Sequence, residues 1–306
     1  MSLEGCIDMY CEATGKFEAR PLSELVLNRT PYPQRGWCVA EVQWMNTKDE
    51  VFGCSPMPPA VFQERVARGE QGLADGLPLK FTHRSDAKLV SRMQEEVFLQ
   101  HARRRKRLEA CSLPQHEVSI LALALPHFVN LVELIIRSPA RGFNFGRSIV
   151  ELAHGLERLR PQKLERLKVE GDGIGDAGAA ALAAAFASCK KLYDIDVASD
   201  NIGDAGAESL AAAVPQCNGL LWIRIGSDNI GDAGAASLAA AALKCKELMS
   251  FELFKCHMIG DAGVAALAAA SLAAPWVTFF LGQHISQLAD RLPHKWSDRT
   301  SERGSD

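Results

Sequence analysis

The chain has 306 residues, of which 47% are hydrophobic and 23% charged, and its formal net charge is −3. This nearly balanced charge gives no electrostatic footprint for nucleic acid or for an anionic membrane. No apolar run approaches the ~18 residues of a membrane-spanning helix, and Met1 to Lys16 lacks the basic and apolar segments of a signal peptide. The composition therefore indicates a globular protein with a sizeable core.

Residues 1–84 are rich in proline and contain few periodic segments, so we expect an irregular N-terminal region that includes some helix. Within it, Arg35–Met45 could open a short helix carrying Trp37, Glu41 and Trp44 along one side, at i, i+4 and i+7. One interpretation is that the two tryptophans pack a small subdomain while Glu41 pairs with a nearby arginine.

The Trp-Cys-x-x-Glu arrangement from Trp37 to Glu41 also resembles the helix-opening motif of TIR-type domains. In some members of that family the matching glutamate serves in NAD cleavage. The resemblance implies that Glu41 is a catalytic carboxylate, and it requires a βαβ sheet core with a nucleotide-binding loop before Arg35. A truncated TIR-like remnant is a further alternative.

Residues 85–163 are predicted to hold a long helix and degenerate capping repeats. Ser85-Asp86 is typical of an N-cap, and an apolar stripe continues the helix from Ala87 to about Glu109. The helix would end in the cationic run Arg103–Arg107, which we interpret as a solvated last turn that suits the helix dipole. The alternative is a nuclear import signal or a patch for an acidic partner.

Three further elements are predicted in this region. Gln115–Leu125 is predicted to be a helix, and Leu131, Leu134 and Ile136 follow a strand pattern, with a weaker strand near Leu108–Leu113. An insertion around Arg141–Gly146 separates this unit from the regular repeats. These units would cap the N-terminal end of a repeat array.

A regular repeat organises residues 164–292. Ile-Gly-Asp-Ala-Gly begins at Ile174, Ile202, Ile230 and Ile259, in steps of 28, 28 and 29. A fixed period of this size is typical of a solenoid. A short strand pattern precedes each copy, at Leu164, Leu167, Val169; Leu192, Ile195, Val197; Leu220, Ile223, Ile225; and Leu248, Phe251, Leu253.

An Ala- and Leu-rich run follows each copy and is long enough for about three helical turns. The aspartate of each copy stands where a helix N-cap belongs, so we expect its carboxylate to accept the free backbone N–H groups of its helix. These aspartates are Asp176, Asp204, Asp232 and Asp261.

One strand and one helix per period, with Leu-x-x-Leu-x-Leu, resembles the leucine-rich repeat family, in its long ribonuclease-inhibitor-type subfamily. The resemblance implies an α/β right-handed solenoid with parallel strands on the concave face and helices on the convex face. The family's ninth position, an Asn or Cys that bonds the turn, falls on Asp172, Asp200, Asp228 and Cys256. The fourth repeat carries one extra residue among Cys256, His257 and Met258.

The array is predicted to end soon after its fourth regular unit. Each strand pattern begins 18 residues after the isoleucine of the preceding copy, as from Ile230 to Leu248, so the same interval after Ile259 predicts a strand from Val277. A capping helix over His284–Leu292 is predicted to follow. Residues 293–306 are polar and are expected to be disordered.

The cysteines are predicted to be structural. Cys189, Cys217 and Cys245 share one position in successive repeats, so they would stack as a buried column of small thiols. Nine cysteines is an odd number, and no CxxC pair occurs. We interpret the chain as reduced and intracellular.

The residues between the buried strand positions point out of the concave sheet. Lys168, Asp196, Arg224 and Glu252 form one column of alternating charge, which can pair laterally across strands ~4.8 Å apart. Trp222 is the single best candidate for a contact residue, because exposed rings and arginines make protein-binding hot spots. The predicted binding set is Arg166, Lys168, Tyr193, Asp194, Asp196, Trp222, Arg224, Met249, Glu252, Phe254 and Lys255.

We find no catalytic constellation, no HExxH and no phosphate-binding GxxxxGK[ST]. We therefore predict a non-catalytic, monomeric, cytoplasmic module, without cofactor or metal, that binds an unidentified protein partner through its concave face in signalling or regulation. A nuclear location would follow from the alternative interpretation of Arg103–Arg107. The alternative function is a TIR-like NAD-cleaving or signalling module with Glu41 as its carboxylate and the repeats as sensor.

Overall fold

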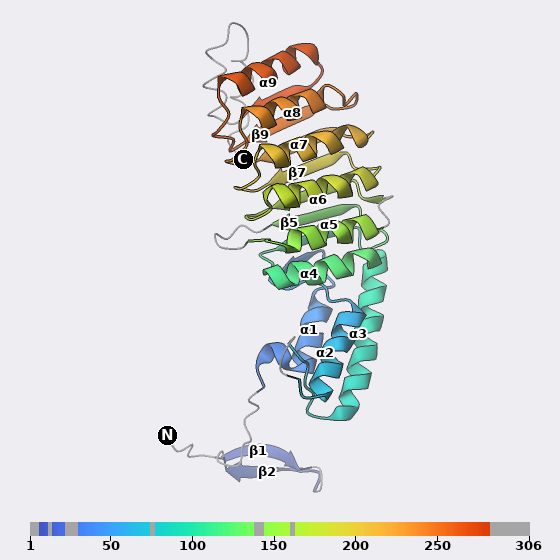
Figure 1. The fold of residues 1–306 in the computed structure, drawn as a ribbon. Coiled ribbons are helices and arrows are strands. Elements are labelled where there is room, and N and C mark those ends of the chain that lie inside the picture. Colours follow the sequence, from blue (N-terminus) through green and yellow to red (C-terminus); the bar gives the residue numbers. More distant parts are fainter. Residues whose placement is uncertain are drawn as a thin grey trace.

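The computed structural model describes residues 6–11, 14–21, 30–73, 77–137, 144–159 and 163–281, which form two sheets. The first is an antiparallel hairpin of β1 (Cys6–Cys11) and β2 (Lys16–Pro21). The second is an eight-stranded parallel sheet in which neighbouring strands follow chain order (Figure 1). Its strands are β3 (Glu50–Phe52), β4 (Arg107–Cys111), β5 (Glu133–Arg137), β6 (Arg166–Glu170), β7 (Asp194–Ala198), β8 (Trp222–Gly226), β9 (Ser250–Phe254) and β10 (Thr278–Leu281).

A row of helices covers one face of the parallel sheet, each packed against the next (Figure 1). This row comprises α4 (Gln115–Ala124), α5 (Ser148–Arg158), α6 (Gly175–Ser188), α7 (Asp204–Ala213), α8 (Asp232–Ala242) and α9 (Asp261–Ala273). Short 3-10 turns follow α4 and α7, namely η3 (Leu125–His127) and η5 (Val214–Gln216). The predicted α/β solenoid is thereby confirmed.

Three further helices form a separate small unit before the repeats. They are α1 (Gly36–Met45), preceded by the turn η2 (Tyr32–Gln34), α2 (Pro59–Glu70) and α3 (Arg84–Arg104), and both α1 and α2 pack on α3. Their core includes Val39, Phe62 and Val90. The strand β3 comes from the same stretch and pairs with β4, so the parallel sheet begins at Glu50, within the expected irregular region.

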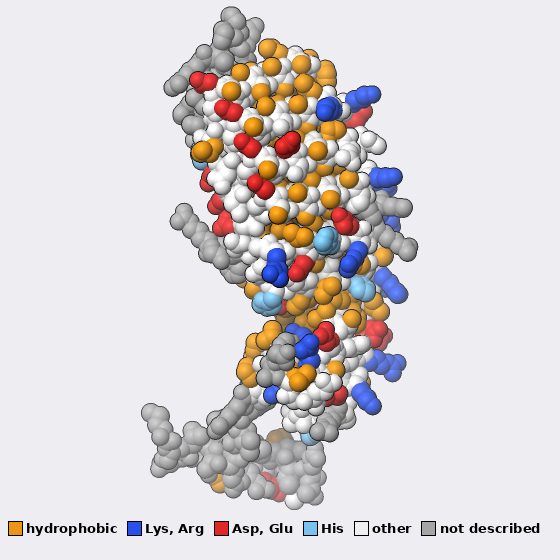
Figure 2. Space-filling model, in the orientation of Figure 1, with side chains coloured by type: hydrophobic (Ala, Val, Ile, Leu, Met, Phe, Trp, Pro, Cys, Tyr) orange, Lys and Arg blue, Asp and Glu red, His pale blue; other side chains and the backbone are white. Residues whose placement is uncertain are grey.

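The repeat pattern buries one face of every strand. In each of the four predicted strand sets all three apolar residues are buried, and they join one continuous core that runs from Val51 to Val277. Strands predicted at Leu131–Ile136 and from Val277 appear as β5 and β10, and the weak strand near Leu108 appears as β4. The outer face of the helices carries scattered small hydrophobic side chains, in keeping with their alanine content (Figure 2).

The repeat aspartates cap helices, but the prediction of which helix they cap was wrong. Asp204 is the first residue of α7, and its Oδ1 accepts hydrogen bonds from the N–H groups of Gly231 (2.8 Å) and Gly234 (2.9 Å) at the start of α8. Asp176 bonds the start of α7 in the same way, and Asp232 bonds the start of α9. Each of these three carboxylates therefore caps the helix of the following repeat, because stacking brings that helix start beside it.

The position that bonds the turn lies one residue earlier than expected. Ser199 and Ser227 are buried there, whereas Asp200 is exposed. The Ser227 hydroxyl donates to the carbonyl of Ile202 at 2.7 Å, which ties adjacent repeats together. In the fourth repeat the expected residue, Cys256, does take the buried place. The extra residue was expected among Cys256, His257 and Met258, but it is Lys255, which is exposed and has a φ of 58°.

The helix predicted to reach Glu109 ends at Arg104, and the cationic run is divided. Arg103 and Arg104 are exposed in the last turn, as a solvated helix end requires. Arg105 is buried, and its Nη2 donates to the backbone carbonyls of Asn46 and Lys48, both at 2.6 Å. Arg107 belongs to β4, so the run is not one continuous solvated patch.

The predicted cysteine column is confirmed. Cys189, Cys217 and Cys245 are buried and unpaired, at the corner between each helix and the next strand. Burial raises the pKa of Cys217 to about 12, and the pKa values of the other two thiols to about 11. Such thiols are unreactive, which fits a packing role.

Several expectations concern residues that lie outside the described part of the chain. These are the capping helix over His284–Leu292, the tail 293–306 and residues 141–143 of the insertion.

Candidate functional site

The face of the parallel sheet opposite α4–α9, here called the open face, carries the predicted binding residues. The strand register places Lys168, Asp196, Arg224 and Glu252 side by side on β6, β7, β8 and β9. Lys168 Nζ lies 2.8 Å from Asp196 Oδ2, Arg224 Nη1 lies 3.4 Å from the same oxygen, and Arg224 Nε lies 3.1 Å from Glu252 Oε1. The predicted column is therefore a connected ladder of ion pairs, the first ladder.

The structure adds a second ladder that the sequence did not reveal. Glu133 stands between Arg107 Nη1 (2.5 Å) and Arg166 Nη1 (3.2 Å), and Arg166 Nε lies 3.3 Å from Asp194 Oδ2. Its members lie at the first position of β4, β5, β6 and β7. Arg166 and Asp194 were predicted to point outward, but Arg107 and Glu133 were not singled out, since they precede the regular period.

Burial and the ion pairs of the ladders shift the pKa values of charged groups on the open face. Burial raises the pKa of Asp194, and the adjacent Arg166 only partly opposes that effect. Burial tends to lower the pKa of Arg224, but Asp196 and Glu252 outweigh it and raise that pKa above its ordinary value. Arg224 is therefore held as a cation between two carboxylates.

Large apolar side chains lie beside the ladders. Trp222 is 41% exposed and Met249 is 55% exposed, although both belong to the ordered repeat units. Tyr193 meets the Trp222 ring edge-on, with ring centroids 5.6 Å apart and planes at 71°. The predicted contact residue is therefore accessible and held by a neighbouring ring.

Phe254 is packed against the sheet itself. A Cβ atom on Gly226 would lie 2.4 Å from the Phe254 ring, so the ring rests directly on the glycine backbone of β8. The Arg224 guanidinium lies 4.0 Å from the centroid of the same ring, within cation–π range. Lys255 lies beyond the strand, and its Nζ is 3.7 Å from Asp200 Oδ1.

The TIR-like alternative receives no support from the N-terminal unit. Before Arg35, the described residues form an antiparallel hairpin and a 3-10 turn rather than a parallel sheet. Trp37 Nε1 donates to Asp86 Oδ2 at 3.0 Å, and Trp44 packs on the small core. Glu41 is exposed, and the predicted pairing with an arginine is not found among the described residues.

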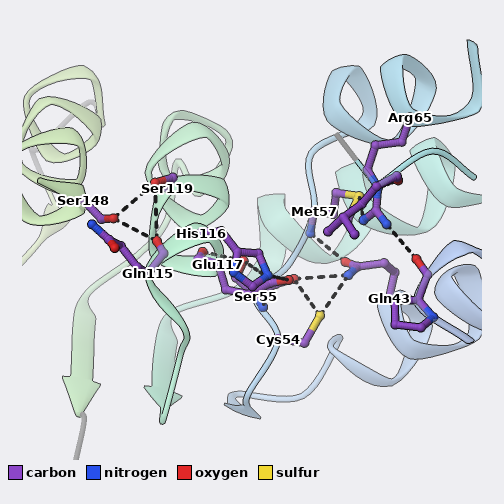
Figure 3. Close-up of polar contacts among 12 residues, drawn as sticks. Gln43, Cys54, Ser55, Met57, Arg65, Gln115, His116, Glu117, Ser119 and Ser148 are labelled. Carbon is purple, nitrogen blue, oxygen red and sulfur yellow. Dashed lines mark hydrogen bonds and ion pairs between the residues drawn. The ribbon is translucent and has the colours of Figure 1, made fainter. Parts of the chain in front are cut away.

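A buried polar network joins this unit to the first repeat helix (Figure 3). Glu117 Oε2 accepts hydrogen bonds from Ser55 N and Ser55 Oγ, both at 2.9 Å. Gln43 Nε2 donates to Ser55 O at 3.2 Å, and its Oε1 accepts from Met57 N at 2.6 Å. Burial raises the pKa of the adjacent Cys54 to about 11, with a further contribution from Glu117. Ser55 is fully buried, so these groups serve as a structural junction.

A small cavity lies between α1, α3 and η3, lined by Trp44, Gln94, Phe98, Arg105 and Phe128 among others. Its volume of about 20 Å³ is enough for about one water molecule. This cavity is too small for a nucleotide.

Comparison with known proteins places one repeat in a family. Residues 244–268, which include β9 and the start of α9, match the family model described as "Leucine Rich repeat". No curated protein matches the chain significantly. In the described part of the chain, no helix combines the length and apolar character needed to cross a membrane. The family match and the parallel sheet of repeated strand–helix units support a leucine-rich repeat architecture.

Proposed function

We propose that the open face of β6–β10 is a protein-binding surface without catalytic activity of its own. The observation that carries this proposal is the exposure of Trp222 on β8, and of Met249 directly before β9, beside charged side chains that are already paired with each other. The surface comprises Arg166, Lys168, Tyr193, Asp194, Asp196, Trp222, Arg224, Met249, Glu252 and Phe254, with Lys255 at its margin.

A preorganised surface favours binding because less side-chain freedom is lost on association. Lys168, Asp196 and Arg224 are linked by ion pairs, and Phe254 lies between Gly226 and Arg224. We therefore assign these groups mainly to shaping the surface. Trp222 and Met249 keep large apolar areas open to solvent, so we assign the largest share of the binding free energy to them.

We infer a place in intracellular signalling or regulation, as a monomer of the long ribonuclease-inhibitor-like repeat type. The constant period between Ile174, Ile202 and Ile230 supports the repeat type. The unpaired state of the described cysteines between Cys38 and Cys256 is typical of a reducing compartment.

Site-specific photo-crosslinking tests this proposal. A photoreactive phenylalanine analogue replaces Trp222 in one variant and Leu272, which is 81% exposed on α9, in the matched control. We expect a discrete crosslinked protein from position 222 and none from position 272. The crosslinked protein, once purified, should bind the wild-type chain and lose at least tenfold in affinity for Trp222→Ala. Equal crosslinking at both positions, or unchanged affinity, would refute the open face as the binding surface.

A further inference from the structure

At their C-terminal ends both ladders finish in the same way on the open face, with a carboxylate followed by an exposed ring. The second ladder ends at Asp194, and the next residue in register is Trp222, which is 41% exposed. The first ladder ends at Glu252, and the next residue in register is Phe280, which is 40% exposed. The alternation of charge therefore stops at two acid–ring pairs, Asp194–Trp222 and Glu252–Phe280.

The terminal carboxylates have fewer cations than the internal ones. Glu133 touches a cation on each side, as does Asp196. Among the described residues, Asp194 is paired with Arg166 alone, at 3.3 Å, and the carboxylate of Glu252 is paired with Arg224 alone, at 3.1 Å. Each of these cations is also shared with an internal acid, so the ladder ends have an excess of negative charge.

The charges on β7–β10 reflect the same imbalance. The charged side chains on the open face of these four strands are Asp194, Asp196, Arg224 and Glu252, which makes three acids and one cation, while Arg166 and Lys168, the cations that pair with Asp194 and Asp196, lie on β6. Burial raises the pKa of Asp194, so its ionised form would gain from a further cation nearby.

We propose that the partner of the open face presents a pair of cationic side chains, arginine or lysine, one to each acid–ring pair. The inference rests on the proposed protein-binding function and specifies the chemistry of the partner. A cation placed at either end continues the alternation of the ladder, and where it lies over the face of the ring, cation–π attraction adds to the ion pair. Arginine suits both contacts, because its planar guanidinium stacks on rings and pairs with carboxylates.

The register also sets the distance between the two cations. Asp194 and Glu252 are two strands apart and two positions apart along the strands. With strands ~4.8 Å apart and residues ~3.3 Å apart along a strand, the two carboxylates lie about 12 Å from each other. In an extended segment this distance corresponds to cations about four residues apart.

A random peptide library displayed on phage, selected on the immobilised full chain, tests the proposal. We expect wild-type protein to enrich peptides with two arginines or lysines at this spacing. The double variant Asp194→Asn, Glu252→Gln keeps the size of both side chains but removes their charge, and we expect it to lose the enrichment. Glu208→Gln, on the exposed side of α7, is the matched control and should select the same peptides as wild type.

Titration of one selected peptide into the three proteins gives the magnitude. We expect affinity to fall about tenfold or more in the double variant, and the loss to shrink at high salt as ionic attraction is screened. Circular dichroism and urea unfolding establish that the double variant is folded. Enrichment of neutral or acidic peptides that bind through Trp222 would overturn the cationic partner and leave the binding surface intact. If none of the selected peptides binds the Trp222→Ala variant more weakly than wild type, both proposals are overturned.

Discussion

Replacement of Asp204 by alanine tests whether one repeat caps the next. The Asp204 carboxylate accepts the N–H groups of Gly231 and Gly234 at 2.8 and 2.9 Å, and these are among the four amides that an α-helix start leaves free. Loss of an N-cap costs about 0.5–2 kcal/mol, and here two bonds to an ionised group are lost at once. Because Asp204 is exposed, water partly replaces the carboxylate, so we expect a loss of about 2 kcal/mol in the free energy of unfolding.

Urea unfolding measures the global part of this effect, and amide hydrogen exchange locates it. If the start of α8 opens locally, about 2 kcal/mol corresponds to roughly thirtyfold faster exchange of the Gly231 and Gly234 amides. The amide of Gly206 in α7 should keep its protection, because Asp176 caps it at 3.0 Å. Asp204→Asn keeps an acceptor and should lose less stability than the alanine variant.

Glu208→Ala is the matched control, since Glu208 is an exposed acid on the same helix. Faster exchange confined to α7 in the Asp204→Ala variant would refute capping between repeats, because it would mean that Asp204 stabilises its own helix. A loss of stability no larger than that of Glu208→Ala would refute the estimated magnitude.

Three further perturbations test the packing, the thiol column and the junction. Gly155→Ala places a Cβ 2.5 Å from the α4 backbone and should cost at least about 1–3 kcal/mol in urea unfolding despite its better helix propensity, whereas Gly219→Ala, with open space around it, should be nearly neutral. Burial raises the pKa of Cys217 from 9.0 to about 12, so the thiol loses its proton at lower pH in the unfolded chain than in the folded protein. The free energy of unfolding should therefore fall as pH rises through this interval. In urea unfolding measured at several pH values, Cys217→Ala should show a smaller fall than wild type. Glu117→Ala leaves the buried Ser55 N–H without its acceptor and should lower the free energy of unfolding by about 1–3 kcal/mol, with faster proteolysis of the N-terminal unit. Glu117→Gln keeps an acceptor, so an equal loss of stability in that variant would argue against a hydrogen-bonding role.

The strands and helices of the regular repeats and the first ladder could be predicted because they depend on a single period. Residues at equal positions in successive repeats must lie side by side, so the period alone predicts that Lys168 lies beside Asp196. The second ladder was not predicted because the steps from Arg107 to Glu133 and from Glu133 to Arg166 differ from this period. The pairing of irregular repeats follows from packing between strands, which a sequence interval does not give.

The target of the capping aspartate could not be predicted for a similar reason. A carboxylate at the first turn can reach its own helix or the next one, and the sequence around Asp204 is the same in either case. The choice depends on how closely successive helices stack, which the small residues Gly206 and Ala207 permit. The burial of Arg105 likewise depends on carbonyl groups of Asn46 and Lys48, which lie far away in sequence.

The capping bonds give the array a polarity. Asp176, Asp204 and Asp232 each cap the helix that comes next in the chain. The start of that helix therefore depends on the preceding repeat for two hydrogen bonds and receives neither of them from the following repeat. Removal of the last unit would leave every earlier cap intact, whereas removal of an early unit would leave the next helix start bare. Stepwise fraying should therefore proceed from the C-terminal end, and shortened chains should tolerate loss of C-terminal repeats better than loss of N-terminal ones.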